Sequence, residues 1–78
     1  MKQFRIAVRS FSDIQAFVSL SMAQPFEVFV GSVEQHISGK SLMSMVGLNH
    51  SRPILVSVNC DEEAFLQFRQ AAARFLVA

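Results

Sequence analysis

Apolar residues along this chain of 78 residues switch between the spacing of a strand and the spacing of a helix. Every second residue is apolar over residues 4–8, the period of a half-buried strand. After Asp13, and again after Asp61, apolar residues recur every three or four positions, the period of an amphipathic helix. A chain of this length buries only one hydrophobic core, so residues 1–78 are predicted to form a single domain.

Turn and capping residues divide these patterns into elements. Ser10 and Asp13 have the spacing of a capping box at a helix start, and Pro25 disfavours continuation of that helix. Acidic residues after Cys60 favour the beginning of a last helix. The expected strands cover residues 3–9, 26–31, 34–38 and 53–59, and the expected helices cover residues 11–23, 40–47 and 62–77.

The resulting order, βαββαβα, predicts an α+β fold of the open-faced sandwich type. Its apolar faces are buried best when a four-stranded antiparallel sheet carries the three helices on one face. The core should then combine one face of the sheet with the apolar stripes of the helices. The residues expected there are Phe4, Ile6, Val8, Phe17, Val28, Val30, Ile54, Val56, Phe65 and Phe68.

Composition narrows the functional classes. Seven basic residues stand against six acidic ones and are scattered along the chain, which argues against a nucleic-acid partner. No apolar stretch has the length of a signal sequence or a membrane span, and the single Cys60 favours the reducing cytoplasm. Hydrophobic residues make up 51% of the chain and charged residues only 17%, so some apolar side chains should remain exposed for a protein partner.

The residues that commonly carry chemistry are sparse and poorly spaced. His36 and His50 lack a second ligand at a recognisable spacing, so we expect neither a metal nor another cofactor. Acidic residues after Cys60 oppose activation of its thiol, which favours an ordinary buried or half-buried cysteine. No nucleophile, base and orienting residue stand at a known spacing, and we therefore do not predict an enzyme.

The segment KSLMSMVGL, residues 40–48, resembles the second helix of the HPr family, the phosphocarriers of the sugar phosphotransferase system. Its position between a hairpin and the strand that starts at Pro53 strengthens the resemblance, which covers nearly the whole chain and implies the HPr-like sandwich. In that family a histidine at the start of the first helix accepts a phosphoryl group. Here Ser10 stands at the approximate place of that histidine and Ser12 at that of the family arginine. Because a serine phosphate ester is too stable to be a ready relay, carrier chemistry is predicted to be lost.

The resemblance also assigns a role to Ser41. This residue matches the serine that a regulatory kinase modifies in the family, and a phosphate there would be stabilised by Lys40 and by free helix amides. The alternative is that Ser41 only caps or begins a helix, since serine is common at that position. The resemblance therefore implies a regulatory phosphosite, and the residue type alone implies a cap.

Too many apolar residues follow Ser41 for all of them to face inward from so short a helix. In the family the matching side chains form the surface used by enzymes and regulators. Met45 is expected in the core, and the alternative is that the whole methionine set fills the space beneath the helix. The partner-binding residues implied by the resemblance are Lys40, Leu42, Met43 and Val46.

These observations favour a regulatory, protein-binding member of the HPr type. Its partners would be phosphotransferase-system enzymes, a serine kinase or a transcriptional regulator. One alternative is an active phosphocarrier with an unconventional acceptor, for which Ser10 and His50 are the candidates. Another is a module unrelated to transport that uses the fold for docking or for self-association.

Overall fold

The predicted βαββαβα order is present in a computed structural model that describes residues 1–31, 37–48 and 51–77. The elements are β1 (Lys2–Ile6), α1 (Phe11–Met22), β2 (Val28–Val30), β3 (Ile37–Ser38), α2 (Leu42–Val46), β4 (Ile54–Val58), α3 (Glu62–Ala71) and a short 3₁₀ helix, η1 (Ala73–Phe75).

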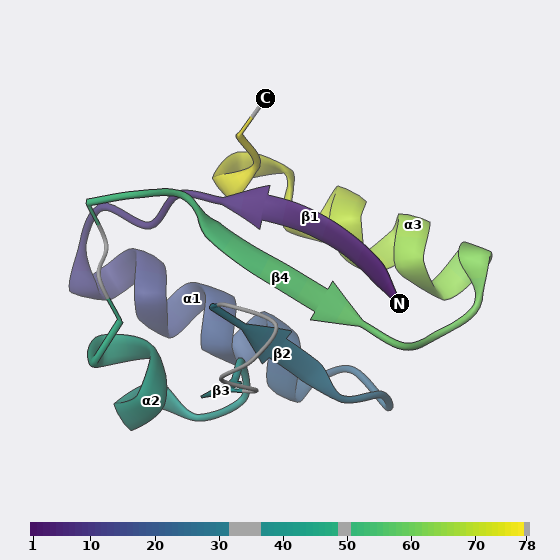
Figure 1. Ribbon diagram of the computed structural model, residues 1–78, viewed down its shortest axis with the longest axis horizontal. Helices are drawn as coiled ribbons and strands as arrows, with labels where there is room; N and C mark the ends of the chain where they lie inside the picture. The colour runs from purple at the N-terminus through teal and green to yellow at the C-terminus, as the bar shows by residue number, and fades with distance from the viewer. Residues whose placement is uncertain (32–36, 49–50, 78) are drawn as a thin grey trace.

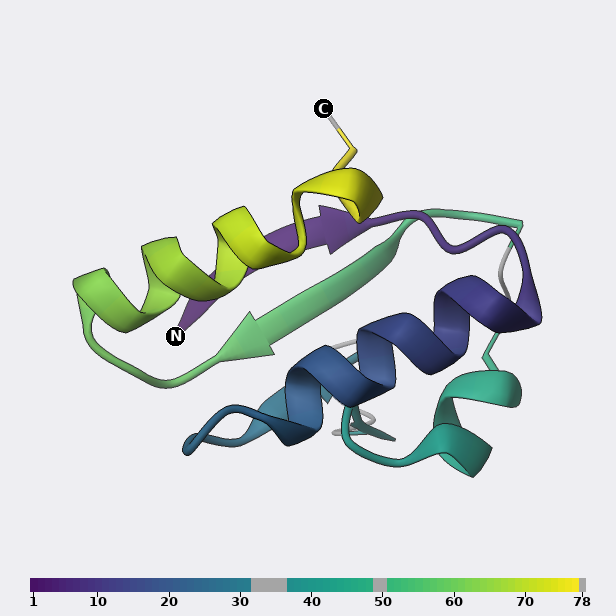
Figure 2. The ribbon, with the colours of Figure 1, turned by 180° about the vertical axis from the view of Figure 1, so that it is seen from behind.

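The four strands form one antiparallel sheet in the order β1-β4-β2-β3. β4 lies between β1 and β2, so that Ile6 pairs with Ile54 on one side and Val30 pairs with Val56 on the other. Helices α1 and α3 lie along one face of the sheet, and α2 lies beside α1 (Figures 1 and 2). The fold is therefore an α+β open-faced sandwich of HPr-like topology, as the order of elements predicted.

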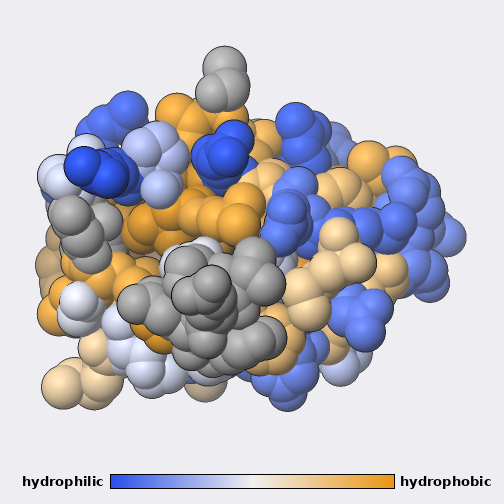
Figure 3. All heavy atoms as spheres, in the orientation of Figure 1, coloured by the Kyte–Doolittle hydropathy of each residue, from blue (hydrophilic) through white to orange (hydrophobic). Residues whose placement is uncertain are grey.

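No helix among the described elements covers the opposite face of the sheet, which is turned toward the viewer in Figure 1. Figure 3 shows this side as a mixture of hydrophilic and apolar surface. Gln3 and Ser57 are paired across β1 and β4, and the Gln3 side-chain amide donates a hydrogen bond of 3.1 Å to the Ser57 hydroxyl. Polar pairing of this kind keeps the face compatible with water.

The core lies between the sheet and the helices, and it contains nine of the ten predicted residues. The exception is Phe65, which is only half-buried and packs against the edge of the core. Its ring lies against Phe4, with 5.9 Å between the ring centroids, and β1 is the edge strand of the sheet, so Phe65 stays at the margin of the core. The full buried set is Phe4, Ile6, Val8, Ile14, Phe17, Val18, Val28, Val30, Met45, Ile54, Val56, Val58, Phe68, Ala72 and Phe75.

Phe68 is the centre of an aromatic cluster within this core. Its ring centroid lies 5.6 Å from those of Phe4 and Phe26 and 6.1 Å from that of Phe17. Phe75 meets Phe17 edge to face at 5.9 Å. Such tilted and edge-on arrangements are favourable because the positive ring edge faces the negative ring face. The cluster joins α3, α1 and β1.

The prediction of a helix over residues 62–77 is wrong about where the helix ends. α3 stops at Ala71, and the chain turns through η1 so that Phe75 is buried and Leu76 pairs with Ile6. The amide of Ala7 donates to the Phe75 carbonyl at 2.8 Å, and the amide of Val77 donates to the Arg5 carbonyl at 3.1 Å. Leaving the helix therefore gives the last residues partners at the outer edge of β1.

The remaining boundaries differ from the predicted ones by up to three residues, mostly because the elements are shorter. The hairpin strand expected over residues 34–38 is described only at Ile37–Ser38, and its first part lies outside the described residues, as do His36 and His50. The helix expected over residues 40–47 is confirmed as α2. It is shorter than predicted, because Ser41 and Gly47 are its capping residues.

Gly39 determines how closely the entrance to α2 approaches the sheet. It is buried, and a Cβ atom added to it would lie 2.7 Å from a Val28 methyl carbon and 3.2 Å from one of Val30. Its amide donates to the Val28 carbonyl at 2.7 Å. The absence of a side chain is therefore required by packing at this position.

We expect Gly39→Ala to destabilise the domain by about 1–3 kcal/mol, the usual effect of overpacking a core. Gly47→Ala is the matched control, because its added Cβ would find its nearest neighbours at 3.6 and 3.8 Å. Urea unfolding of the two variants measures the difference. Equal stability of the two would show that the contact with Val28 relaxes without penalty.

Truncation of the central ring tests the core. Phe68→Ala should lower the free energy of unfolding by about 3–5 kcal/mol, because it removes buried area and leaves a cavity between α1, α3 and β1. Leu66→Ala, in the same helix but 51% exposed, serves as the control and should have a much smaller effect. A loss below about 1 kcal/mol for Phe68→Ala in urea unfolding would contradict the assignment of the helix face.

Candidate functional site

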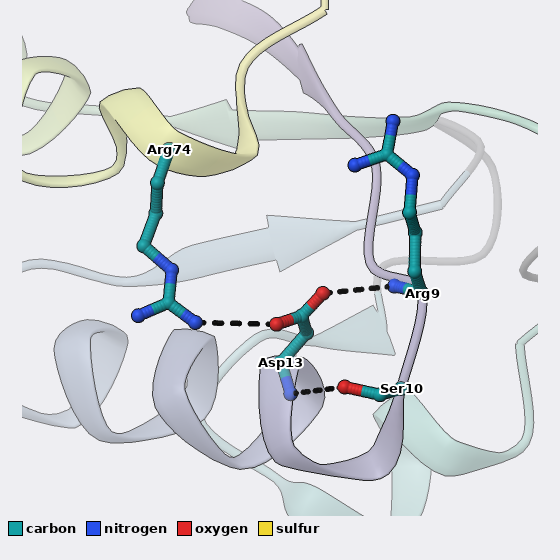
Figure 4. Close-up of polar contacts among 4 residues, drawn as sticks. All are labelled: Arg9, Ser10, Asp13 and Arg74. Carbon is teal, nitrogen blue, oxygen red and sulfur yellow. Dashed lines mark hydrogen bonds and ion pairs between the residues drawn. The ribbon is translucent and has the colours of Figure 1, made fainter.

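Ser10, which the HPr resemblance places near the phosphorylated histidine of that family, is the N-cap of α1. Its backbone is extended, with φ −147° and ψ 164°, and its hydroxyl accepts a hydrogen bond of 3.1 Å from the Asp13 amide (Figure 4). The predicted start of this helix is therefore confirmed. The hydroxyl satisfies one of the amides that a helix start leaves without an intrahelical partner.

Asp13 completes the cap from the other direction. One carboxylate oxygen accepts from the Arg9 amide at 3.1 Å, and the other accepts from the Arg74 guanidinium at 3.2 Å (Figure 4). The hydrogen bond from the Arg9 amide and the positive charge of Arg74 hold the pKa of the Asp13 carboxyl below its ordinary value. The Asp13 carboxylate is therefore ionised at neutral pH, and it is held in an ion pair with Arg74.

Ser41 is the N-cap of α2. Its backbone is extended, with φ −107° and ψ 112°, and its hydroxyl accepts a hydrogen bond of 3.4 Å from the Ser44 amide. The capping role that its residue type predicts is therefore observed. The regulatory phosphorylation that the family resemblance implies stays a prediction.

Lys40 is held by the protein itself. Its ammonium group donates to the Gln24 carbonyl at 3.0 Å, just beyond the end of α1, and its amide donates to the Ser38 hydroxyl at 3.2 Å. A cation at this place also complements the negative end of the α1 dipole. Lys40 therefore joins the entrance of α2 to the end of α1, and its charge is already engaged.

The side chains of α2 divide between the core and the solvent. Met45 is fully buried, as predicted, and Leu42 is half-buried against the core. Met43 is 82% exposed and Val46 is 43% exposed. We refer to Met43 and Val46 as the α2 surface; of the predicted partner-binding residues, these two are the exposed apolar ones.

The beginning of α1 adds a feature that the sequence analysis missed. Phe11 is 54% exposed and, with Ser10, lines a shallow pocket of about 200 Å³ together with Val8, Arg9 and Ile14. No sequence signal separates this residue from a core phenylalanine, because it lies three positions before Ile14 on the same helical stripe. Both ribbon views place α2 beside the first half of α1, so Phe11 and α2 lie toward the same end of the molecule (Figures 1 and 2).

Other groups that could carry chemistry are not assembled into a site. Among residues 1–31, 37–48 and 51–77, no three histidine, cysteine or acidic side chains lie close enough together to hold a metal ion. Burial raises the pKa of the half-buried Cys60 thiol, and the neighbouring Asp61 charge raises it further. The described helices include none that is both long and apolar enough to cross a lipid bilayer.

Comparison with known proteins does not assign the chain to a family. No protein-family model matches it, and no curated protein matches it. The fold and the residues described above therefore carry the functional argument.

The Asp13 cap should make stability depend on pH. Because the pKa of Asp13 is lowered in the folded protein, its contribution is present above about pH 4, the ordinary value for aspartate, and is lost as the pH falls through the folded value. Asp13→Asn should thus have a lower urea midpoint than the wild type at pH 7, and the difference should shrink as the pH is lowered from about 4 toward 2. Glu27→Gln, a change of an exposed acidic residue, is the control. A difference for Asp13→Asn that is constant over this range would contradict the assignment.

Proposed function

We propose that this protein is an HPr-like regulatory protein that acts by binding other proteins through the α2 surface. The observation that carries the proposal is the exposure of Met43 and Val46 on a helix whose third apolar residue, Met45, already fills the core. Core packing explains why Met45 is apolar and, because Leu42 is half-buried, explains Leu42 in part. It does not explain an apolar residue at Met43. An exposed methionine is flexible and polarisable, which suits a surface that adapts to a partner.

The start of α1 supports regulation rather than phosphate transfer. The Ser10 hydroxyl serves as a cap, and the Asp13 carboxylate occupies the positive end of the helix where an incoming phosphoryl group would need to be stabilised. A phosphate on serine would also be too stable to pass on readily. The alternative function is phosphoryl transfer, by an active phosphocarrier that uses Ser10 or His50 as its acceptor.

The setting we propose is the cytoplasm, within the regulation of sugar transport by the phosphotransferase system. Enzymes of that system, a serine kinase or a transcriptional regulator are the partners that the HPr resemblance suggests. Ser41 would be an optional switch, because a phosphate there would add negative charge two residues from Met43.

Substitutions on α2 test the surface. Met43→Asp should weaken partner binding by at least about tenfold, because binding would have to desolvate a charge in the middle of the contact. Ser41→Asp should also change the affinity, since it introduces part of the charge of a phosphate. Leu66→Asp, a charge placed on the exposed side of α3, is the matched control and should bind as the wild type does.

The measurement is a pull-down from the native cytoplasm followed by titration of the captured protein, with circular dichroism to verify each fold. Equal binding by the wild type, Met43→Asp and Ser41→Asp would refute the α2 surface. Phosphoenolpyruvate-dependent labelling by Enzyme I tests the alternative. Acid-labile phosphate on the protein would replace the regulatory proposal with a carrier function.

A further inference from the structure

The outer edge of β1 is only partly paired within the described residues. The C-terminal segment bonds to this edge at the Arg5 carbonyl and the Ala7 amide. Backbone groups of a strand point alternately to its two sides, so those of Gln3 point to the same outer side as those of Arg5 and Ala7. The edge therefore presents an amide and a carbonyl at Gln3, next to a segment that already pairs with it in the antiparallel direction.

A pocket of about 360 Å³ lies at this part of the edge. Arg5 and Leu55 reach it from paired positions of β1 and β4, and Arg69 reaches it from α3 on the helical side of the sheet. Both ribbon views show α3 beside β1, with η1 near the end of that strand (Figures 1 and 2). The lining residues are Gln3, Phe4, Arg5, Leu55, Arg69, Leu76 and Val77.

The charge of this pocket is not balanced by the described part of the chain. Among the described residues, ion pairs join Lys2 to Glu62 and Arg74 to Asp13. Neither pair involves the guanidinium of Arg5 or Arg69. Two exposed guanidinium groups at one pocket favour an anion. Each has a planar set of donors that matches the two oxygens of a carboxylate.

The other walls suit a strand rather than a free ion. Leu55, Leu76 and Val77 provide apolar contacts beside the two arginines, and mixed apolar and hydrophilic surface is seen on this side of the molecule in Figure 3. An added strand places its side chains alternately on the two sides of the sheet, so one residue can reach an arginine while its neighbours contact apolar groups. Backbone bonds to Gln3 would supply affinity, and the arginines would supply selectivity.

We propose that this edge binds an extended acidic peptide segment of another protein, which adds to β1 at Gln3 and places a carboxylate in the pocket that Arg5 and Arg69 line. The segment would continue the outer strand that Leu76 and Val77 begin. This surface is separate from the α2 surface, and the proposal does not depend on the function proposed above.

Fluorescence anisotropy with a labelled, end-blocked peptide, Thr-Val-Glu-Val-Thr, tests the proposal on the full chain. The affinity should fall by about tenfold or more with Arg5→Gln or Arg69→Gln, since each change removes a charge-assisted hydrogen bond. The affinity of Arg5→Lys should lie between those of the wild type and Arg5→Gln, because lysine keeps the charge but lacks the planar set of donors. Arg52→Gln, an exposed arginine outside the pocket, is the control and should bind as the wild type does.

Changes in the peptide make the test independent of any effect on folding. Replacing its glutamate by glutamine should weaken binding as much as Arg5→Gln does, and replacing either valine by proline should weaken it by removing a backbone donor. Equal binding of the glutamine peptide, or no binding of the glutamate peptide at millimolar concentration, would overturn the proposal. Competition by acetate or inorganic phosphate as strong as that by unlabelled peptide would also overturn it, in favour of a site for free anions.

Discussion

The ring of Phe68 is buried where α1, α3 and β1 meet, and the placement of the other elements depends on that contact. It touches Phe4 on the first strand, Phe17 on the first helix and Phe26 just before the second strand. Each of these rings comes from a different part of the chain, so one buried side chain joins segments far apart in sequence. A domain of this size has few such contacts, and each accounts for a large share of its stability.

α2 depends on that core for its existence. A helix of five residues is far too short to be stable alone, because helix nucleation is unfavourable and few hydrogen bonds follow it. Its position is set instead by the burial of Met45, by the close approach at Gly39 and by the bond from Lys40 to the end of α1. Because these contacts use the inner side of the helix and its entrance, Met43, which is 82% exposed, takes no part in them.

Local patterns in the sequence were sufficient to predict the strands, the helix starts and most of the core. Phe4 and Ile6 alternate with polar residues, and Ser10 with Asp13 forms a recognisable cap; both features depend on neighbours within four residues. The end of α3 could not be predicted in this way, because Phe75 keeps the helical spacing and only its distant partners draw it out of the helix.

In the candidate site, too, local features could be predicted from the sequence and contacts between distant segments could not. The exposure of Met43 followed from an excess of apolar residues in a short helix, whereas the engagement of Lys40 with Gln24 depends on how two helices pack. The contact of Asp13 with Arg74 joins residues 61 positions apart, and no pattern in the sequence marks it.

The strand order also has a consequence for the making of the protein. β4 separates β1 from β2, yet it is the last strand of the sheet to be synthesised. A chain emerging from the ribosome therefore carries β1, α1 and β2 with their apolar faces exposed, since β1 has no neighbouring strand until Val58 has emerged and Phe68 follows later still. The sheet can therefore be completed only after β4 has emerged, and until then the apolar faces of the earlier elements are open to chaperones or to aggregation.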